Sequence, residues 1–342
     1  MRSYQLLAAE SIQLQDIPTP EPEVGEVRVR VQACSICSRT DLVYYLYCGI
    51  KPHCHVGHFG HEVAGVIDQV GHGVTNWREG DRVFLRFPSR GGGFSECVIA
   101  SDPAIGRLPA HMSYIEGAPC QQVPIAVNAT RTLRAGDNVA IIGQGSAGLQ
   151  LLQLARIRGA AKVVVADLYD ARLEIARELG ADVLVNASCQ DTVAEVRKVF
   201  PEGPDVVYDA VGIKSVAQQC VDAVRHEGIV CIFGTHHVEE QVTFNLVQWE
   251  AKALTIHMAN EGSRHAAAEA MRIAERLLAN RLIETKPYIT HVFDLEDLPK
   301  ALELLKVSPI LYPEGDPRGQ GLPAKEALKV VIRIGPDAER TG

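Results

Sequence analysis

The chain has 342 residues, of which 46% are hydrophobic and 22% are charged, and its formal net charge is −8. This length predicts two domains, since single cores stop growing beyond about 250–300 residues, and an acidic chain without a basic stripe argues against nucleic acid as a partner. The sequence has no run of about 18 apolar residues and no long apolar segment near its start, so we expect no membrane span, no secretory signal and a cytoplasmic location.

The first hundred residues contain short β-strand candidates separated by glycine-rich turns. Residues 27–31 alternate apolar and charged side chains, as a half-buried strand does. Residues 62–67, 82–85 and 94–99 are further short apolar stretches. Strands this short, with turn signals between them, predict a β-rich, barrel-like domain.

Side chains with metal-ligand chemistry gather between the first two of these strands. Thiol, imidazole and carboxylate groups occur together there, a mixture that suits zinc. The residues are Cys34, Cys37, Asp41, His53, Cys54, His55, His58, His61 and Glu62. We expect Cys34 to be a buried strand residue and the histidines before His61 to lie in an exposed loop. Nine cysteines, an odd number, without an export signal argue against a disulfide framework.

A glycine-rich turn follows the apolar strand candidate at residues 139–142 and leads into a helical pattern. Gly143 permits a tight turn, Gly145 leaves room for a pyrophosphate, and Gly148 lets the helix pack closely on the strand. The unpaired N–H groups and the positive dipole end at the start of the helix would then bind phosphates. The turn therefore predicts a dinucleotide site.

Asp167 lies 19 residues after Gly148, directly after a second strand candidate at residues 162–166. This is the separation expected in a dinucleotide-binding crossover. The carboxylate accepts hydrogen bonds from both ribose hydroxyls and repels a 2′-phosphate, so we predict NAD rather than NADP. The expected coenzyme contacts are Gly143, Gly145, Ser146, Ala147, Gly148, Asp167 and Arg172, and the family resemblance described below adds Gly212.

Strand and helix patterns alternate from about residue 136 onward. The strand candidates are residues 139–142, 162–166, 183–185, 205–208, 228–233 and 254–258. Six strands alternating with helices predict an α/β domain with a doubly wound parallel sheet covered on both faces. Residues 327–334 are a closing strand candidate. We place a nucleotide-binding domain at residues 131–279, inserted into a β-rich domain formed by residues 1–130 and 280–342.

Several of these motifs follow one another along nearly the whole chain. They are Cys37 with Thr40-Asp41, Gly60-His61-Glu62, Gly80-Asp-Arg-Val83, the glycine turn, and residues 205–212 and 295–305. This succession resembles the zinc-type medium-chain dehydrogenases, the alcohol and polyol dehydrogenase-like enzymes. The resemblance implies a GroES-like catalytic domain, a Rossmann-type coenzyme domain, and hydride transfer between NAD and a secondary alcohol such as a polyol, cyclitol or sugar-like alcohol. It also implies a homodimer or homotetramer.

The resemblance assigns roles to individual residues. Cys37 and His61 would be ligands of one catalytic zinc, and Glu62 would lie beside the metal. Thr40 matches the hydroxyl that passes the substrate proton to solvent, and Asp41 matches the acid that orients His61. Zinc would polarise the substrate oxygen while the carbinol hydride moves to the nicotinamide.

The chain departs from the family pattern around these residues. Two residues, Ser38 and Arg39, separate Cys37 from Thr40 where the family usually has one, which predicts a displaced Thr40. Val43 stands where many relatives have a relay histidine. Any proton path must therefore differ from the usual one.

The third zinc ligand is another departure. Gln121 stands at its position, with Cys120 adjacent, and a neutral amide is a poor zinc ligand. Either of the two would complete the site, or zinc would be weakly held or absent. Relatives with a structural zinc carry four closely spaced cysteines after the Gly-Asp-Arg-Val motif, whereas this chain has only Cys97 there, so we predict no structural zinc.

Two other functions remain open from the sequence. One is a zinc-free enone or quinone reductase of the same fold, and the other is a non-catalytic nucleotide-binding protein, because fold does not fix function. Near the site, Tyr44, Tyr45 and Tyr47 would line a substrate pocket or pack in the core. His236 and His237 would reach the nicotinamide or lie in an exposed loop.

Overall fold

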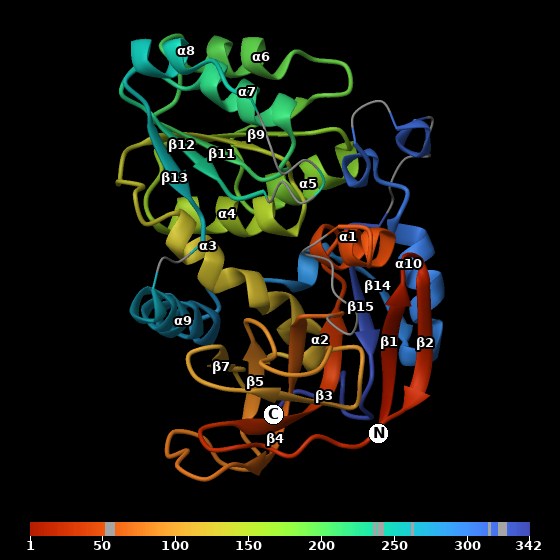
Figure 1. The fold of residues 1–342 in the computed structure, drawn as a ribbon. Helices are drawn as coiled ribbons and strands as arrows, with labels where there is room; N and C mark the ends of the chain where they lie inside the picture. Colours follow the sequence, from red (N-terminus) through yellow and green to blue (C-terminus); the bar gives the residue numbers. More distant parts are fainter. Residues whose placement is uncertain (52–58, 235–237, 239–242, 261–262, 314–315, 321–326) are drawn as a thin grey trace. The chain divides into compact units, whose positions relative to one another are not determined.

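The structure, a computed structural model, describes residues 1–51, 59–234, 238, 243–260, 263–313, 316–320 and 327–342 (Figure 1). Contacts divide the chain into two compact units, Met1–Pro124 with Gly262–Gly342 and Ile125–Glu261. The first unit is thus built from both ends of the chain, and the second is inserted into it along the sequence.

The inserted unit is built on a parallel six-stranded sheet with the order β10-β9-β8-β11-β12-β13 (Figure 1). Its strands are β8 (Asn138–Ile142), β9 (Lys162–Asp167), β10 (Val183–Asn186), β11 (Val206–Asp209), β12 (Ile229–Ile232) and β13 (Thr255–Met258). The helices along this part of the chain are α3 (Val123–Ala129), α4 (Ser146–Ile157), α5 (Asp170–Glu178), α6 (Thr192–Val199), α7 (Lys214–Ala223) and α8 (Leu246–Ala251). The six expected strands are confirmed, because parallel strands buried on both faces are short apolar runs in the sequence.

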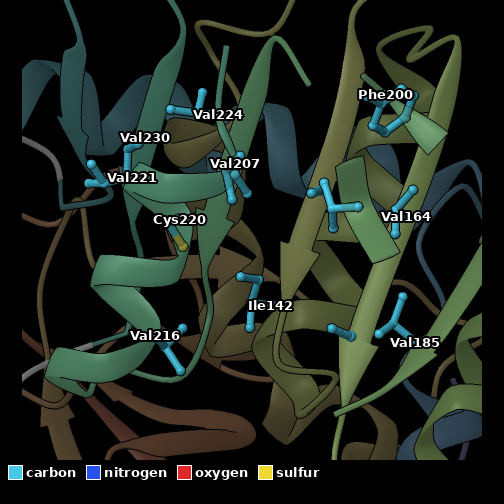
Figure 2. Close-up of a cluster of buried hydrophobic side chains, with 14 residues drawn as sticks. Ile142, Val164, Val185, Phe200, Val207, Val216, Cys220, Val221, Val224 and Val230 are labelled. Carbon is cyan, nitrogen blue, oxygen red and sulfur yellow. The ribbon is translucent and has the colours of Figure 1, made fainter. Parts of the chain in front are cut away.

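Apolar side chains of this sheet and its helices form one buried cluster (Figure 2). Val207 and Val230 belong to strands, whereas Val216 and Val221 belong to α7. Burying a side chain of this kind contributes about 1.5–3 kcal/mol. The cluster thereby fixes the parallel strands, whose carboxyl ends share one edge of the sheet, where parallel α/β sheets bind their ligands.

The other unit contains a seven-stranded sheet and a separate hairpin. The strand order of the sheet is β14-β15-β3-β4-β5-β7, with β6 paired to β3, and β1 pairs with β2 in the hairpin. The strands are β1 (Arg2–Ala8), β2 (Ser11–Asp16), β3 (Val27–Ser35), β4 (Glu62–Val70), β5 (Arg82–Leu85), β6 (Cys97–Ala100), β7 (Ile105–Arg107), β14 (Ile289–Asp294) and β15 (Lys329–Arg333).

Helices and 3₁₀ turns of this unit accompany the sheet. They are α1 (Thr40–Tyr47), α2 (Tyr114–Gly117), α9 (Arg264–Ala279), α10 (Leu298–Leu305) and the 3₁₀ turns η1 (Ala118–Gln122), η2 (Lys286–Tyr288), η3 (Leu295–Asp297), η4 (Pro309–Leu311) and η5 (Pro317–Gly319). β15 is the expected closing strand, and it pairs antiparallel with β3, with Val331 opposite Ser35. An α/β fold with a Rossmann-type sheet and a separate β-rich sheet is thereby confirmed.

The contacts place the unit boundaries at different residues from the expected ones. They lie at 124/125 and 261/262 rather than at 130/131 and 279/280, so α9 belongs to the β-rich unit. The backbone N–H of Arg107, at the end of β7, donates to the Glu275 carboxylate on α9 at 2.6 Å. The spacing of apolar residues in an amphipathic helix shows that one face of the helix is buried, but it does not show which sheet that face covers.

Candidate functional site

Cys37, His61 and Glu62 lie together at one end of two paired strands. Their potential ligand atoms all lie within 4.8 Å of one another. β3 and β4 are antiparallel with Ser35 opposite Glu62, so the register brings the residues just after β3 next to those that begin β4. The donors are one thiol, one imidazole and one carboxylate, a set that fits zinc.

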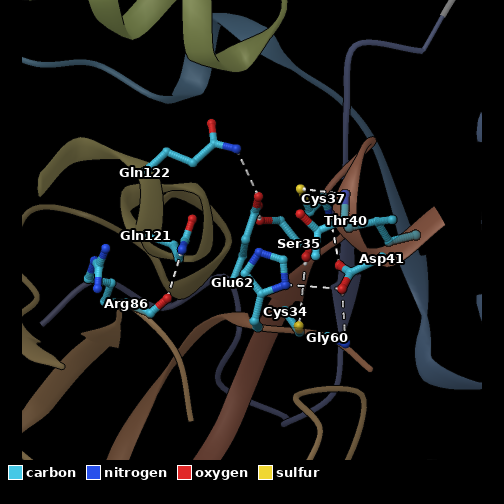
Figure 3. A network of polar contacts seen from close by, with 12 residues as sticks. Cys34, Ser35, Cys37, Thr40, Asp41, Gly60, Glu62, Arg86, Gln121 and Gln122 are labelled. Carbon is cyan, nitrogen blue, oxygen red and sulfur yellow. Dashed lines mark hydrogen bonds and ion pairs between the residues drawn. The ribbon is translucent and has the colours of Figure 1, made fainter. Parts of the chain in front are cut away.

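Asp41 connects the two sides of this group (Figure 3). Its buried carboxylate accepts hydrogen bonds from the backbone N–H groups of Cys37 and Gly60, at 2.9 and 3.2 Å. The same carboxylate lies 3.1 Å from Nδ1 of His61. Nδ1 is thereby engaged, which leaves Nε2 as the ring nitrogen available to a metal.

The Cys37 thiol and the His61 ring influence each other's protonation. Burial disfavours the thiolate, but the hydrogen bond and charge of His61 outweigh burial and lower the pKa of Cys37. Burial also disfavours the imidazolium, yet the charge and hydrogen bond of Asp41, together with Cys37, raise the pKa of His61 well above its ordinary value. The Cys37 thiolate is the form that binds a metal, and a divalent cation would replace the His61 proton.

Thr40 begins α1 and lies beside these residues despite the longer spacing. Its backbone N–H donates to Sγ of Cys37 at 3.3 Å. A pocket of about 270 Å³ is lined by Thr40, Tyr44 and His61, among others, with the rings of Phe59 and Phe87 on its wall. Of the three tyrosines, Tyr44 thus lines the pocket.

The other two tyrosines pack. Tyr45 is buried and its ring stacks with Phe59, at 6.5 Å between ring centroids. Tyr47 is buried and donates from its hydroxyl to the carbonyl of Leu311 at 3.0 Å. Cys34 is a buried residue of β3, as expected. The histidine loop His53, Cys54, His55 and His58, and the pair His236 and His237, lie outside the described residues.

The glycine turn follows β8 as expected. Gly143 has a φ of +98°, which favours glycine, and a Cβ on Gly148 would lie 1.8 Å from the carbonyl oxygen of Gly143. Among the described residues, leaving aside its two chain neighbours, none has an atom within 4 Å of a Cβ placed on Gly145. α4 begins at Ser146, with Ala147 also in its first turn, so the N-terminal end of the helix lies at the turn.

Asp167 ends β9 and its carboxylate lies close to the glycine turn. It accepts hydrogen bonds from the backbone N–H groups of Gln144 and Tyr169, at 2.7 and 3.1 Å. Nη1 of Arg172 lies 3.7 Å from the same carboxylate. Asp167 and Arg172 are therefore neighbours.

Gly212 follows β11. It has a φ of +81°, and its N–H donates to the buried carboxylate at the end of that strand.

The sequence matches two family models, Zinc-binding dehydrogenase over residues 147–276 and Alcohol dehydrogenase GroES-like domain over residues 23–110. It is 31% identical over 251 residues to the (R,R)-butanediol dehydrogenase of Bacillus subtilis (strain 168), which covers 64% of this chain and 72% of that protein. The chain belongs to the zinc-type medium-chain alcohol dehydrogenase family. It is also 28% identical over 337 residues to the sorbitol dehydrogenase of Gallus gallus, which covers 87% of this chain and 91% of that protein.

Solved structures of alcohol dehydrogenases have the same fold. Alcohol dehydrogenase TADH from Thermus sp. ATN1 gives a TM-score of 0.81 at 25% identity, covering 98% of this chain and 100% of that one. A short chain alcohol dehydrogenase from E. coli CFT073 complexed with NADH gives 0.79 at 25% identity, covering 97% and 99%. In the part of the chain that the structure describes, no helix combines the length and apolar character needed to cross a membrane.

Family membership confirms the resemblance seen in the sequence. The chain is an alcohol dehydrogenase-like oxidoreductase that acts on a small molecule, and the family implies a catalytic zinc and a nicotinamide coenzyme. The Cys37, His61 and Glu62 group fits that zinc by the chemistry of its donors.

The surroundings of Glu62 were missed by the sequence analysis. Nζ of Lys329 lies 2.8 and 3.0 Å from its two carboxylate oxygens. Ser35 donates to the same carboxylate from its hydroxyl, and Nε2 of Gln122 donates to it at 3.1 Å (Figure 3). Lys329 and Glu62 are only 1% and 0% exposed. The sequence contained one sign of this ion pair, a lysine inside the apolar run at residues 327–334, because a buried lysine requires a partner of opposite charge.

The predicted third ligand lies next to this network. Nε2 of Gln121 donates to the carbonyl of Arg86 at 2.7 Å, and Figure 3 shows the side chain directed there. The Cys120 thiol contacts the carbonyl of Glu116 at 3.5 Å, and burial raises the pKa of this thiol strongly. The amide that contacts Glu62 is therefore that of the following residue, Gln122.

Proposed function

We propose that this chain is an NAD-dependent, zinc-assisted oxidoreductase that interconverts a secondary alcohol and a ketone by hydride transfer. The observation that carries the proposal is the convergence of the Cys37, His61 and Glu62 donor atoms within 4.8 Å. Zinc-free reductases of this fold lack the cysteine and the histidine, so the donor set argues for the zinc-assisted reaction.

Cys37 and His61 would hold the ion, with Glu62 as the third donor beside them. When bound, zinc acts as a Lewis acid that lowers the pKa of the substrate hydroxyl. Gln121 stays a predicted ligand, and it would have to turn its amide oxygen toward the ion while its nitrogen bonds to Arg86. Lys329 balances the charge of Glu62 and keeps its carboxylate in place.

Asp41 and Thr40 supply the orientation and the proton path. Asp41 fixes the His61 ring through Nδ1 and ties the Cys37 backbone to the same carboxylate. Thr40 lines the pocket together with His61, so its hydroxyl can accept the substrate proton and pass it to solvent. Val43, which stands at the relay histidine position, is fully buried, so the path leaves along another route.

The coenzyme would bind at the carboxyl edge of the parallel sheet. Gly145, Ser146, Ala147 and the start of α4 offer backbone N–H groups to the pyrophosphate, and Gly143 and Gly148 allow the turn to close. The Asp167 carboxylate would accept hydrogen bonds from the adenosine ribose and repel a 2′-phosphate, which supports NAD. Arg172 beside it and Gly212 after β11 would complete the site.

The relatives support a diol or polyol as substrate, since the names that match include butanediol and sorbitol dehydrogenases. A homodimer or homotetramer in the cytoplasm, without a structural zinc, belongs to the same proposal. The single Cys97 after the Gly80–Val83 motif supports the last point, since a structural site takes four ligands.

Metal analysis combined with turnover tests this function. The purified protein should contain about one zinc per chain and reduce NAD with butane-2,3-diol or sorbitol. Cys37→Ala should lose zinc and turnover while it still binds NADH in a fluorescence titration. The exposed thiol of Cys189 gives the matched control, and Cys189→Ala should keep both zinc and turnover. Full activity in zinc-free protein would contradict the proposal.

A further inference from the structure

Helix α1 is attached at both of its ends to one distant turn. Just before its first residue, the guanidinium of Arg39 donates a hydrogen bond to the carbonyl of Ile310. In its last turn, the hydroxyl of Tyr47 donates to the carbonyl of Leu311 at 3.0 Å. Two consecutive carbonyls of the turn Pro309–Leu311 therefore hold the two ends of an eight-residue helix.

The segment that carries these carbonyls is itself held in place. The Tyr312 hydroxyl donates to the carbonyl of Lys306, at the end of α10, at 3.1 Å. The Arg318 guanidinium lies 5.2 Å from the Tyr312 ring and 5.9 Å from the Tyr47 ring, and it pairs with Asp316 at 2.8 Å. The segment is thus a support for α1 rather than a loop that only passes over it.

Helix α1 carries two side chains of the pocket, whose positions affect the proposed proton transfer. Thr40 and Tyr44 line the pocket. Cys37 and His61 follow β3 and precede β4, and Asp41, which also belongs to α1, ties both of them to this helix. The position of the Thr40 hydroxyl relative to these ligands therefore depends on how α1 lies.

Arginine is an unusual residue at the position before a helix that Arg39 occupies. It is the N-cap residue of α1, where Ser, Thr, Asp or Asn would satisfy a free N–H, and its side chain makes no capping hydrogen bond. Its guanidinium is directed instead to Ile310. It also belongs to the longer spacer between Cys37 and Thr40.

We propose that Arg39 is a positioning residue which, through Ile310, sets the Thr40 hydroxyl for proton transfer; this inference rests on the function proposed above. The turn Pro309–Leu311 and the Tyr47 hydroxyl fix the other end of the same helix. A displacement of about 1 Å of a reacting group can lower turnover about 100-fold, so a support of this kind affects kcat without contacting the substrate.

A double-mutant cycle tests this positioning. Arg39→Ala should lower kcat about tenfold or more and raise the solvent deuterium isotope effect on kcat, because proton transfer becomes slower. Zinc content and NADH affinity should stay as in the wild type. In a Thr40→Ala background, Arg39→Ala should have no further effect, since it acts through Thr40. Arg177→Ala, an exposed arginine paired with Glu174, is the control and should leave kcat unchanged.

Several outcomes would overturn the proposal. Additive losses in the cycle would mean that Arg39 acts elsewhere, and loss of zinc from Arg39→Ala would mean that it acts on the ligands. Amide hydrogen exchange gives a readout that does not need turnover: residues 40–47 should exchange faster in Arg39→Ala, and an unchanged rate would refute the support. Wild-type protein that turns over no secondary alcohol would instead refute the proposed function.

Discussion

Replacing Lys329 with methionine would leave the Glu62 carboxylate buried without its counter-ion. The two side chains are 1% and 0% exposed, so solvent offers little screening of the charge that remains. Methionine has a similar length and no charge, which leaves little cavity behind. Ser35 and Gln122 would remain as hydrogen-bond donors, but neither carries a positive charge.

The expected loss of stability follows from the burial of the Lys329–Glu62 ion pair. Removing one partner of a buried ion pair costs about 3–5 kcal/mol, because the other charge stays in a medium of low polarity. We therefore expect the free energy of unfolding of the β-rich unit to fall by about this amount in zinc-free protein. The double variant Lys329→Met/Glu62→Gln should regain most of the loss, since no uncompensated charge remains.

Tryptophan fluorescence can measure this loss of stability. Trp77 lies in the β-rich unit and Trp249 in the inserted unit. In a Trp249→Phe background, the fluorescence of Trp77 reports guanidinium-induced unfolding of the β-rich unit. Lys300→Met, which removes the exposed partner of Asp297, is the control and should cause no resolvable change. An unfolding curve of Lys329→Met that coincides with the wild-type curve would refute the reasoning.

The coenzyme site gives two further predictions. Gly148→Ala places a Cβ 1.8 Å from the Gly143 carbonyl oxygen, so this variant should have a lower melting temperature and should not bind NADH. Gly145→Ala meets no described atom beyond its chain neighbours, so this variant should keep the wild-type melting temperature and lose only NADH binding. Asp167→Asn should raise the kcat/KM ratio of NADP to NAD, because it removes the carboxylate charge that repels a 2′-phosphate. Two like charges about 4 Å apart at a dielectric constant of about 20 repel each other by about 4 kcal/mol, so the rise can reach about 1000-fold. An unchanged ratio would mean that Asp167 does not select the coenzyme.

The features predicted correctly from the sequence depend on short stretches of chain. The parallel strands are continuous apolar runs, and the glycine turn after β8 is recognised from three residues and their spacing. The distance from that turn also locates Asp167 at the end of β9, whereas its role in coenzyme binding stays a prediction. In each case the physical requirement, burial on both faces or a backbone that approaches closely, acts on neighbouring residues, so it leaves a local pattern.

The features that were missed depend on residues far apart in the chain. Lys329 contacts Glu62 across 267 positions, and Arg39 contacts Ile310 across 271. Neither lysine nor arginine shows in the sequence which partner it has. The placement of α9 has the same cause, because its apolar face would suit either sheet.

The net charge of the proposed metal site depends on residues that are far apart in the sequence, and not on the third ligand alone. With a glutamine at position 121, the sequence suggests a site one negative charge short of relatives that have an acid or a cysteine there. The structure places Glu62 beside Cys37 and His61, but it also places Lys329 on Glu62, so the pair adds no net charge. The divalent ion would then face one thiolate as its uncompensated anionic donor. A more positive site favours the deprotonated form of an alcohol, so the neutral amide at Gln121 is compatible with oxidation of a secondary alcohol rather than evidence against it.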